Sequence, residues 1–178
     1  MAKVHATRRI FEGRVIRLRV DDVEYDNGAR SSVEIVEHDG GVAIIAQPSV
    51  RSIVLVRQFR PAIERELWEV PAGKLERGED PLACAKRELE EETGYTCSVM
   101  RRLWGFFTAP GFCNERLHLF VAEGLTSGAA RPEPTEVLHA REFGVDEAWA
   151  MVERDEIPDA KTQIALGWCL RGSGSDRR

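Results

Sequence analysis

Apolar and polar positions alternate in several short stretches near the start of the chain. Residues 10–20 alternate roughly between apolar and charged side chains, and residues 23–25 and 33–36 flank the turn sequence Asp26-Asn27-Gly28. An Asn-Gly pair between two such stretches is a strong signal for a β-hairpin. The chain is therefore expected to open with antiparallel β-structure.

Two continuous apolar stretches follow, at residues 42–46 and 53–56. Apolar stretches of this length are typical of strands that are covered on both faces, so they are expected in the middle of a sheet. Weaker patterns predict three more strands and two helices: strands near residues 102–107, 117–121 and 137–143, and helices near residues 146–153 and 160–170.

The most regular helical pattern covers residues 82–93. Asp80 and Pro81 supply an N-cap and a proline at the first helical position, and Gly94 supplies the residue that commonly ends a helix. Strands before, between and after the helices indicate an α/β or α+β fold with a mixed sheet.

Composition and charge narrow the class of protein. The 178 residues are 43% hydrophobic and 31% charged, which fits one compact globular unit. A net charge of -5 argues against sequence-independent nucleic-acid binding, and an acidic protein that binds a polyphosphate must recruit cations. No secretory signal and no stretch near the roughly 18 apolar residues of a membrane span were found, so a cytoplasmic protein without a membrane partner is expected.

Cysteine spacing also bears on the compartment. Cys84, Cys97, Cys113 and Cys169 are scattered without a paired spacing. Such cysteines are expected to be reduced thiols that belong neither to a disulfide framework nor to a zinc site.

Three glutamates on the expected helix are the first candidates for chemistry. Glu91 and Glu92 lie three and four positions after Glu88, which places the three carboxylates on one helix face. A hard divalent cation such as Mg²⁺ favours these oxygen ligands and leaves positions for water and substrate phosphates. For a Glu-rich helix in general, a solvated acidic face is the alternative.

A longer motif surrounds these glutamates. It starts at Gly73 and continues through Glu79 to Arg87-Glu88-Leu89, Glu91-Glu92, Thr93 and Gly94-Tyr95. This pattern matches, position by position, the signature of the Nudix hydrolase family. The resemblance implies a Nudix α/β/α sandwich, in which a loop-helix-loop element holds Mg²⁺, with Mn²⁺ as the alternative ion, against a diphosphate linked to a further group.

The resemblance assigns roles to the residues of the motif. Four positions correspond to metal ligands: the backbone carbonyl of Ala72 and the carboxylates of Glu88, Glu91 and Glu92. Glu91 and Glu92 are also catalytic candidates, Arg87 resembles the residue that orients the acidic side chains, and Glu79 resembles an outer participant. Metal ions of this kind neutralise charge on the bridging and leaving oxygens and hold the attacking water.

Residues outside the motif narrow the range of expected substrates. Pro110 lies sixteen positions after Gly94, and its surroundings resemble the proline-containing signature of the ADP-ribose pyrophosphatase branch, as do residues 56–61 and 67–73. The resemblance covers residues 37–120 and implies hydrolysis of ADP-ribose to AMP and ribose 5-phosphate. GDP-mannose or another nucleotide sugar is the alternative substrate, and a non-catalytic nucleotide-sugar sensor is a third interpretation.

Six side chains are candidates for contact with the substrate: Arg57, Arg60, Trp68, Glu76, Glu115 and, from the N-terminal hairpin, Glu34. The guanidinium of Arg60 suits bidentate contact with phosphate oxygens, and a surface ion pair is its alternative role. Trp68 either stacks on a base or fills the core. A further catalytic glutamate is expected from the loop before the last strand, with Glu136 preferred and Glu133 the alternative.

The resemblance also implies how the chain is divided and assembled. Residues 1–38 are expected to form a β-extension through which two copies make a homodimer, with one copy helping to enclose the nucleotide of the other. Residues 39–171 are expected to form the Nudix domain, and residues 172–178 a flexible tail.

Overall fold

The computed structural model describes residues 1–131 and 137–172. The chain folds as two compact units. The first contains Met1–Gly40 together with a mid-chain segment, Gly105–Leu117, and the second contains Gly41–Trp104 and His118–Arg178. A segment from the middle of the sequence thus belongs with the N-terminal residues.

A three-stranded antiparallel sheet dominates the first unit. Strands β1 (Ala2–Glu12), β2 (Arg17–Tyr25) and β3 (Arg30–Glu37) pair in the order β1-β2-β3. Gly28 adopts a φ of 80° in the turn between β2 and β3, a conformation that glycine takes without strain. The expected hairpin around Asp26-Asn27-Gly28 is therefore confirmed.

The mid-chain segment of this unit is tied to β3 by backbone hydrogen bonds. The N–H of Val36 donates to the carbonyl of Phe112 at 2.8 Å, and the N–H of Asn114 donates to the carbonyl of Val36 at 3.1 Å. The side-chain oxygen of Asn114 accepts the N–H of His38 at 2.8 Å. These bonds fix the stretch that contains Pro110 beside the hairpin.

A seven-stranded sheet forms the frame of the second unit. The order is β10-β5-β4-β9-β8, with β6 paired to β5 and β7 paired to β4. The strands are β4 (Gly41–Gln47), β5 (Ser52–Arg60), β6 (Arg65–Glu69), β7 (Ala72–Lys74), β8 (Tyr95–Phe107), β9 (Arg116–Ser127) and β10 (His139–Gly144). β4 is buried throughout and β5 over its first five residues, as the two apolar stretches predict.

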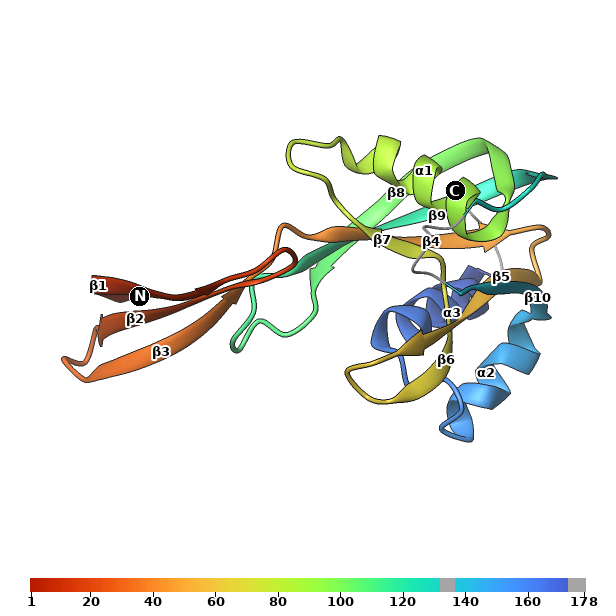
Figure 1. Ribbon diagram of the computed structural model, residues 1–178. Coiled ribbons are helices and arrows are strands. Elements are labelled where there is room, and N and C mark those ends of the chain that lie inside the picture. The colour runs from red at the N-terminus through yellow and green to blue at the C-terminus, as the bar shows by residue number, and fades with distance from the viewer. Residues whose placement is uncertain (132–136, 173–178) are drawn as a thin grey trace. The chain divides into compact units, whose positions relative to one another are not determined.

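Helices cover both faces of this sheet. Figure 1 shows α1 (Pro81–Thr93) on one side of β4, and α2 (Val145–Glu153) and α3 (Ala160–Gly172) on the other. The Asp80 carboxylate accepts the N–H of Ala83 at 3.1 Å, and Gly94 ends α1 with a φ of 73°. The predicted α/β sandwich with a mixed sheet is confirmed, and all three helices begin and end within two residues of their predicted positions.

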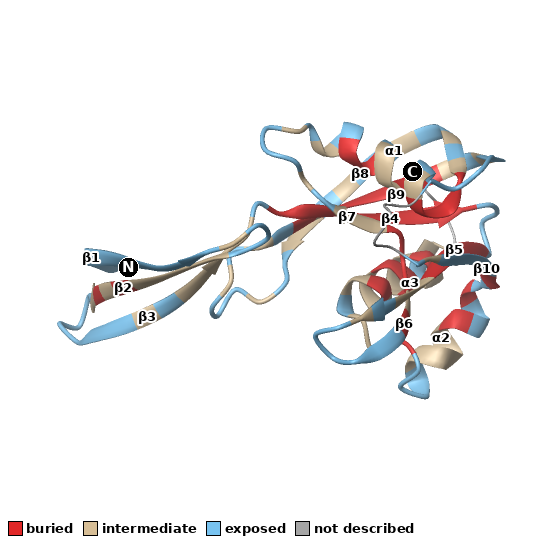
Figure 2. Ribbon diagram, viewed as in Figure 1, coloured by how far each residue is buried: buried red, intermediate tan, exposed pale blue. Residues whose placement is uncertain are grey.

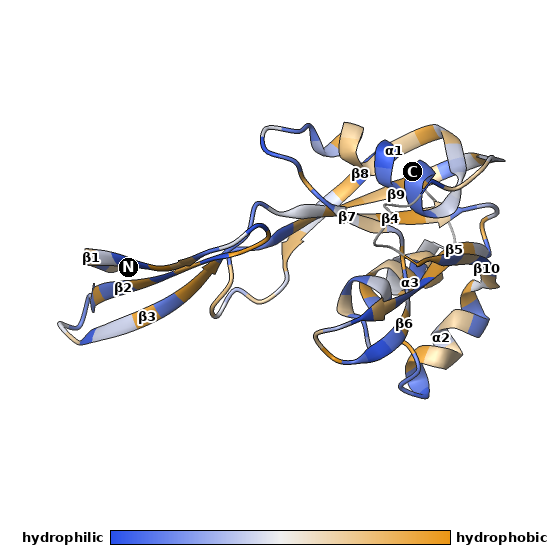
Figure 3. Cartoon of the chain, in the orientation of Figure 1, coloured by the Kyte–Doolittle hydropathy of each residue, from blue (hydrophilic) through white to orange (hydrophobic). Residues whose placement is uncertain are grey.

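One part of the core of the second unit lies between α1 and the central strands. Figure 2 shows buried residues along these strands, and Figure 3 shows that the same stretches are hydrophobic. Residues four positions apart on α1 face the sheet, as an amphipathic helix requires. The buried cluster consists of Val42, Ile44, Ala46, Val54, Cys84, Ala85, Leu89, Phe120 and Ala122.

Two strands and several strand ends were not predicted. β6 contains three charged residues in the five-residue sequence RELWE, and β7 has only three residues, so neither shows a clear period of its own. β8 begins seven residues before the expected start, and β9 continues six residues beyond the expected end. Within the described ranges, no helix has both the length and the apolar character needed to cross a membrane.

Leu89→Ala is expected to lower the free energy of unfolding by about 2–5 kcal/mol, because the lost side chain leaves a cavity in the core. Leu89 is 1% exposed and packs in the cluster beneath α1. Urea unfolding followed by circular dichroism measures the change. Leu82→Ala is the control, because Leu82 lies on the same helix but is 38% exposed. Equal losses for the two variants would contradict this orientation of α1.

Candidate active site

The three glutamates of the motif lie in the C-terminal half of α1. Glu92 is 4% exposed, whereas the side chains of Glu88 and Glu91 are 13% and 36% exposed. Burial of a carboxylate is costly unless hydrogen bonds or cations compensate its charge. The partners of these three side chains therefore decide whether the cluster is stable.

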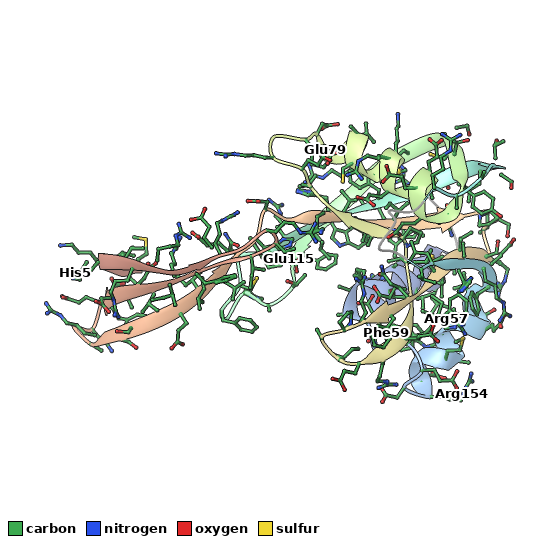
Figure 4. All side chains as sticks on the ribbon, in the orientation of Figure 1. His5, Arg57, Phe59, Glu79, Glu115 and Arg154 are labelled. Atoms are coloured by element: carbon green, nitrogen blue, oxygen red, sulfur yellow. The ribbon has the colours of Figure 1, made fainter. Side chains whose placement is uncertain are left out.

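Arg87 is the cation that holds the cluster together. Its Nη1 atom donates to Glu88 Oε1 at 2.7 Å and to Glu91 Oε2 at 2.9 Å. Its Nε and Nη2 atoms donate to the two carboxylate oxygens of Glu79, each at 3.1 Å. Glu79, labelled in Figure 4, lies in the loop before α1 and also accepts the N–H of Glu76 at 2.9 Å. One guanidinium thus binds three carboxylates.

These contacts shift the pKa values of the groups involved. The hydrogen bond with Glu79 is the largest influence that raises the pKa of Arg87 above its ordinary value, and Glu88 and Glu91 add to it. The same bond is the main reason that the pKa of Glu79 lies below its ordinary value. Both groups are therefore charged at neutral pH.

Cys84 lies against the same guanidinium. Arg87 Nη2 approaches Cys84 Sγ at 3.4 Å, and the thiol is 3.5 Å from the carbonyl oxygen of Lys74. Burial, followed by the negative charge of Glu79, raises the pKa of Cys84 to about 12. None of the four cysteines, all of which lie among the described residues, forms a disulfide bond.

Two glutamates of α1 reach the short strand β7. The backbone N–H of Ala72 donates to Glu92 Oε2 at 3.0 Å. The carboxyl group of Glu88 packs directly on Gly73, where an added Cβ would lie 1.9 Å from Glu88 Cδ. Only glycine at this position leaves the Glu88 carboxylate where it is. The sequence predicts the importance of this glycine through the motif but not its physical reason.

The carboxylate oxygens at this site are of the chemical type that a hard divalent cation prefers. Arg87 Nη1 already lies between carboxylate oxygens of Glu88 and Glu91, and carboxylate oxygens are the ligands that Mg²⁺ prefers. Across residues 1–131 and 137–172, no group of three acidic, His or Cys side chains is arranged for one ion. The arginine therefore supplies the positive charge here, and the assignment of Glu88, Glu91, Glu92 and the Ala72 carbonyl as ligands stays a prediction.

Comparison with known protein families identifies the family of this chain. The model of the NUDIX domain matches residues 37–165. This chain belongs to the Nudix hydrolase family. The Nudix motif residues Gly73 to Gly94 lie inside the matched range, and they form the Arg87 network and the contact of α1 with β7.

Individual relatives match most of the chain. A protein named methanol dehydrogenase activator from Bacillus methanolicus is 48% identical over 92% of this chain and 90% of its own length. An ADP-ribose pyrophosphatase from Bacillus subtilis (strain 168) is 45% identical with the same coverage. A solved structure described as an ADP compounds hydrolase has a TM-score of 0.83, covering 97% of this chain and 96% of that one, at 21% identity. The last likeness supports the fold.

Arg60 is engaged by a buried glutamate. Its Nε and Nη2 atoms donate to the two carboxylate oxygens of Glu69 at 2.7 and 2.6 Å. Glu69 is 1% exposed, a position that no sequence pattern singled out. The bond to Glu69 is the largest influence raising the pKa of Arg60, and the charge of Glu92 contributes as well. Arg60 therefore forms an ion pair in which the carboxylate, that of Glu69, is buried.

The pKa of Glu69 reflects two opposing influences. Burial, the larger single influence, raises it, but hydrogen bonds and charges from Arg60 and Lys161 together lower it below its ordinary value. The carboxylate is charged at neutral pH for this reason.

Arg57 and Trp68 pair across β5 and β6. The guanidinium carbon of Arg57 lies 5.9 Å from the centroid of the Trp68 ring, which contacts Phe143 edge-on at 4.9 Å. Arg57 Nε is buried and has no hydrogen-bond partner among the described residues, and its distance to Glu66 is 3.6 Å. A buried donor without a partner is a feature that a bound ligand or water commonly resolves. Figure 4 labels Arg57 beside Phe59 on this hairpin.

The remaining candidates are distributed over other parts of the chain. Glu76 is exposed in the loop before α1, and Glu34 is exposed on β3 of the first unit. Glu115, also in the first unit, accepts the hydroxyl of Thr108 at 2.7 Å. Glu133 and Glu136 lie outside the described residues.

Gly73→Ala is expected to weaken metal binding by about 10- to 100-fold, because the added methyl group displaces the carboxylate of Glu88. Binding of Mn²⁺ followed by electron paramagnetic resonance measures this directly. Gly167→Ala is the control, since a Cβ at Gly167 meets no atom within 4 Å. Unchanged Mn²⁺ affinity in Gly73→Ala would show that Glu88 is not a ligand.

Proposed function

We propose that this protein is a metal-dependent diphosphatase that hydrolyses nucleoside diphosphate sugars, with ADP-ribose as its preferred substrate. The products would be AMP and ribose 5-phosphate. The observation that carries the proposal is the Arg87 network, in which one guanidinium gathers Glu79, Glu88 and Glu91 while Glu92 binds β7. The relative named ADP-ribose pyrophosphatase, 45% identical over 92% of the chain, supports the choice of substrate.

Different charged residues have different roles in the proposed reaction. Glu88, Glu91 and Glu92 would hold Mg²⁺, or Mn²⁺ in its place, with the carbonyl of Ala72. The bound ion supplies positive charge for the diphosphate oxygens and lowers the pKa of water. Arg87 orients the carboxylates of Glu88 and Glu91 through its hydrogen bonds. Proton removal from the attacking water falls to a carboxylate, with Glu92, Glu91, Glu136 and Glu133 as the candidates.

Substrate recognition falls to residues outside the motif. Arg57, whose Nε makes no hydrogen bond among the described residues, is suited to a phosphate or sugar oxygen, and the Trp68 ring is suited to stacking. Glu69 occupies one edge of the Arg60 guanidinium, so Arg60 would contact the substrate through its remaining nitrogen. Carboxylates accept hydrogen bonds from ribose hydroxyls and base amino groups, which is the role proposed for Glu34, Glu76 and Glu115.

The purified protein is expected to release AMP from ADP-ribose only when Mg²⁺ is present, and faster than product forms from GDP-mannose, other nucleotide sugars or dinucleotides. Phosphate-product analysis across this panel measures the preference. Glu92→Gln should lower turnover by at least about 100-fold, because a catalytic carboxylate is lost while the shape of the side chain stays.

Glu90→Gln is the matched control for that variant, because Glu90 is exposed on the same helix. Full activity of Glu92→Gln would refute the proposed role of Glu92. A large preference for GDP-mannose would make GDP-mannose the proposed substrate in place of ADP-ribose. Binding of nucleotide sugars without hydrolysis would indicate a sensor.

We also propose that the first unit joins two copies of the chain. All eleven residues of β1 are exposed, including Val4 at 52%, Ile10 at 54% and Phe11 at 54%. A small sheet with an exposed edge strand and exposed apolar side chains needs a partner for stability. A second copy supplies one with the same surface, as is common in symmetric dimers.

Sedimentation analysis is expected to give twice the 20.0 kDa mass of one chain. Ile10→Asp should shift the mass toward one chain, because it places a charge in the proposed interface. Val137→Asp is the control, since Val137 is 76% exposed but belongs to the second unit. A monomeric wild-type protein would contradict the dimer.

A further inference from the structure

Helix α3 begins with a capped turn. The carboxylate of Asp159 accepts the N–H of Thr162 at 3.0 Å and its hydroxyl at 2.6 Å, and the carbonyl of Asp159 accepts the N–H of Gln163 at 3.0 Å. Asp159 is therefore the N-cap of α3, a position at which aspartate is strongly preferred. Helix α3 lies outside the motif that holds the acidic cluster.

The Thr162 hydroxyl also reaches the segment that leads to β7. A hydroxyl has one hydrogen to donate, and Thr162 donates it to Asp159. The oxygen is thereby oriented to accept the backbone N–H of Val70 at 2.9 Å. Thr162 is 0% and Val70 1% exposed, so water cannot readily replace this bond.

The neighbouring Lys161 adds an ionic link to the same segment. Its Nζ atom donates to Asp159 Oδ1 at 2.9 Å and also donates to Glu69 Oε2. Glu69 in turn holds Arg60 through two hydrogen bonds. Charges alternate along this row, which allows a carboxylate that is 1% exposed to remain ionised.

Segment 69–72 is consequently fixed at every residue. The side chain of Glu69 is bound by Lys161, and the N–H of Val70 is bound by Thr162. The carbonyl of Pro71 accepts the N–H of Ile44 at 2.8 Å, and the N–H of Ala72 donates to Glu92. Two of these four restraints come from the first turn of α3.

We propose that Lys161 and Thr162 are positioning residues for hydrolysis. They act through segment 69–72, whose last residue binds the Glu92 carboxylate and presents the backbone carbonyl that the ion would share. The inference rests on the proposed function, because it takes Glu92 and the Ala72 carbonyl as ligands. Neither residue contacts the reacting atoms, so their effect is on the geometry of the ligands that do.

The test compares Thr162→Val with Thr162→Ser. Valine keeps the shape of threonine but leaves the Val70 N–H without an acceptor, whereas serine keeps the hydroxyl. We expect Thr162→Val to need about 10-fold more Mn²⁺ for half-saturation without substrate, measured by electron paramagnetic resonance. Its kcat for ADP-ribose should fall while KM stays within about twofold. Thr162→Ser should restore both values.

Gln163→Leu is the matched control for a purely structural role. Gln163 Nε2 donates to the carbonyl of Ile157 at 2.9 Å, so this variant loses a hydrogen bond in the same turn without touching segment 69–72. It should keep wild-type Mn²⁺ affinity even if its Tm falls. Lys161→Met, which breaks the link to Glu69 but keeps the side-chain length, should weaken Mn²⁺ binding in the same direction and provides a second variant if Thr162→Val does not fold.

Each outcome of these measurements either supports or overturns the inference. Wild-type Mn²⁺ affinity in Thr162→Val or, should that variant not fold, in Lys161→Met would overturn it, as would an equal loss in Gln163→Leu. A wild-type protein that binds Mn²⁺ but hydrolyses no nucleotide sugar would refute the proposed function, while a weaker Mn²⁺ affinity in Thr162→Val would still support positioning. Absence of Mn²⁺ binding by the wild type would overturn both.

Discussion

Repulsion among carboxylates on one face of α1 is the constraint around which the second unit is organised. Like charges one helical turn apart destabilise a helix, and burial strengthens the repulsion. Arg87 offsets it by binding Glu79, Glu88 and Glu91 at once. The same repulsion that costs stability in the protein alone would favour a further cation at the cluster, as the proposed function requires.

The surrounding fold keeps this cluster in place through backbone as much as side chains. Glu92 is held by the N–H of Ala72, and Glu88 packs where Gly73 has no side chain. β7 pairs with the buried strand β4, whose apolar residues pack beneath α1. The hydrophobic core beneath α1 thus also fixes the position of the carboxylates that the helix turns toward β7.

Short-range sequence signals account for the elements that could be predicted. The cap and proline before α1, the glycine after it and the Asn-Gly turn each act within a few residues, and the structure confirms both elements. The motif identified the glutamates together with Arg87 and Gly73. β6 and β7 escaped prediction because their pairing partners, and not their own periodicity, make them strands.

Contacts between residues far apart in the sequence could not be predicted from such local signals. Glu69 and Lys161 are 92 positions apart, and no spacing rule connects a glutamate inside an apolar stretch to a lysine at a helix start. The ion pair of Arg60 with Glu69 likewise depends on the bend between β5 and β6. Such pairs become visible only when the fold brings the two segments together.

Cys84 gives the Arg87 network a property that its carboxylates alone would not have. Thiolates, and not thiols, react with oxidants and electrophiles, and a thiol whose pKa is raised to about 12 is almost entirely protonated at neutral pH. The sulfur beside Arg87 is therefore a poor nucleophile at neutral pH. The central cation of the acidic cluster therefore lies within 3.4 Å of a sulfur that stays in its neutral thiol form and adds no charge to the cluster.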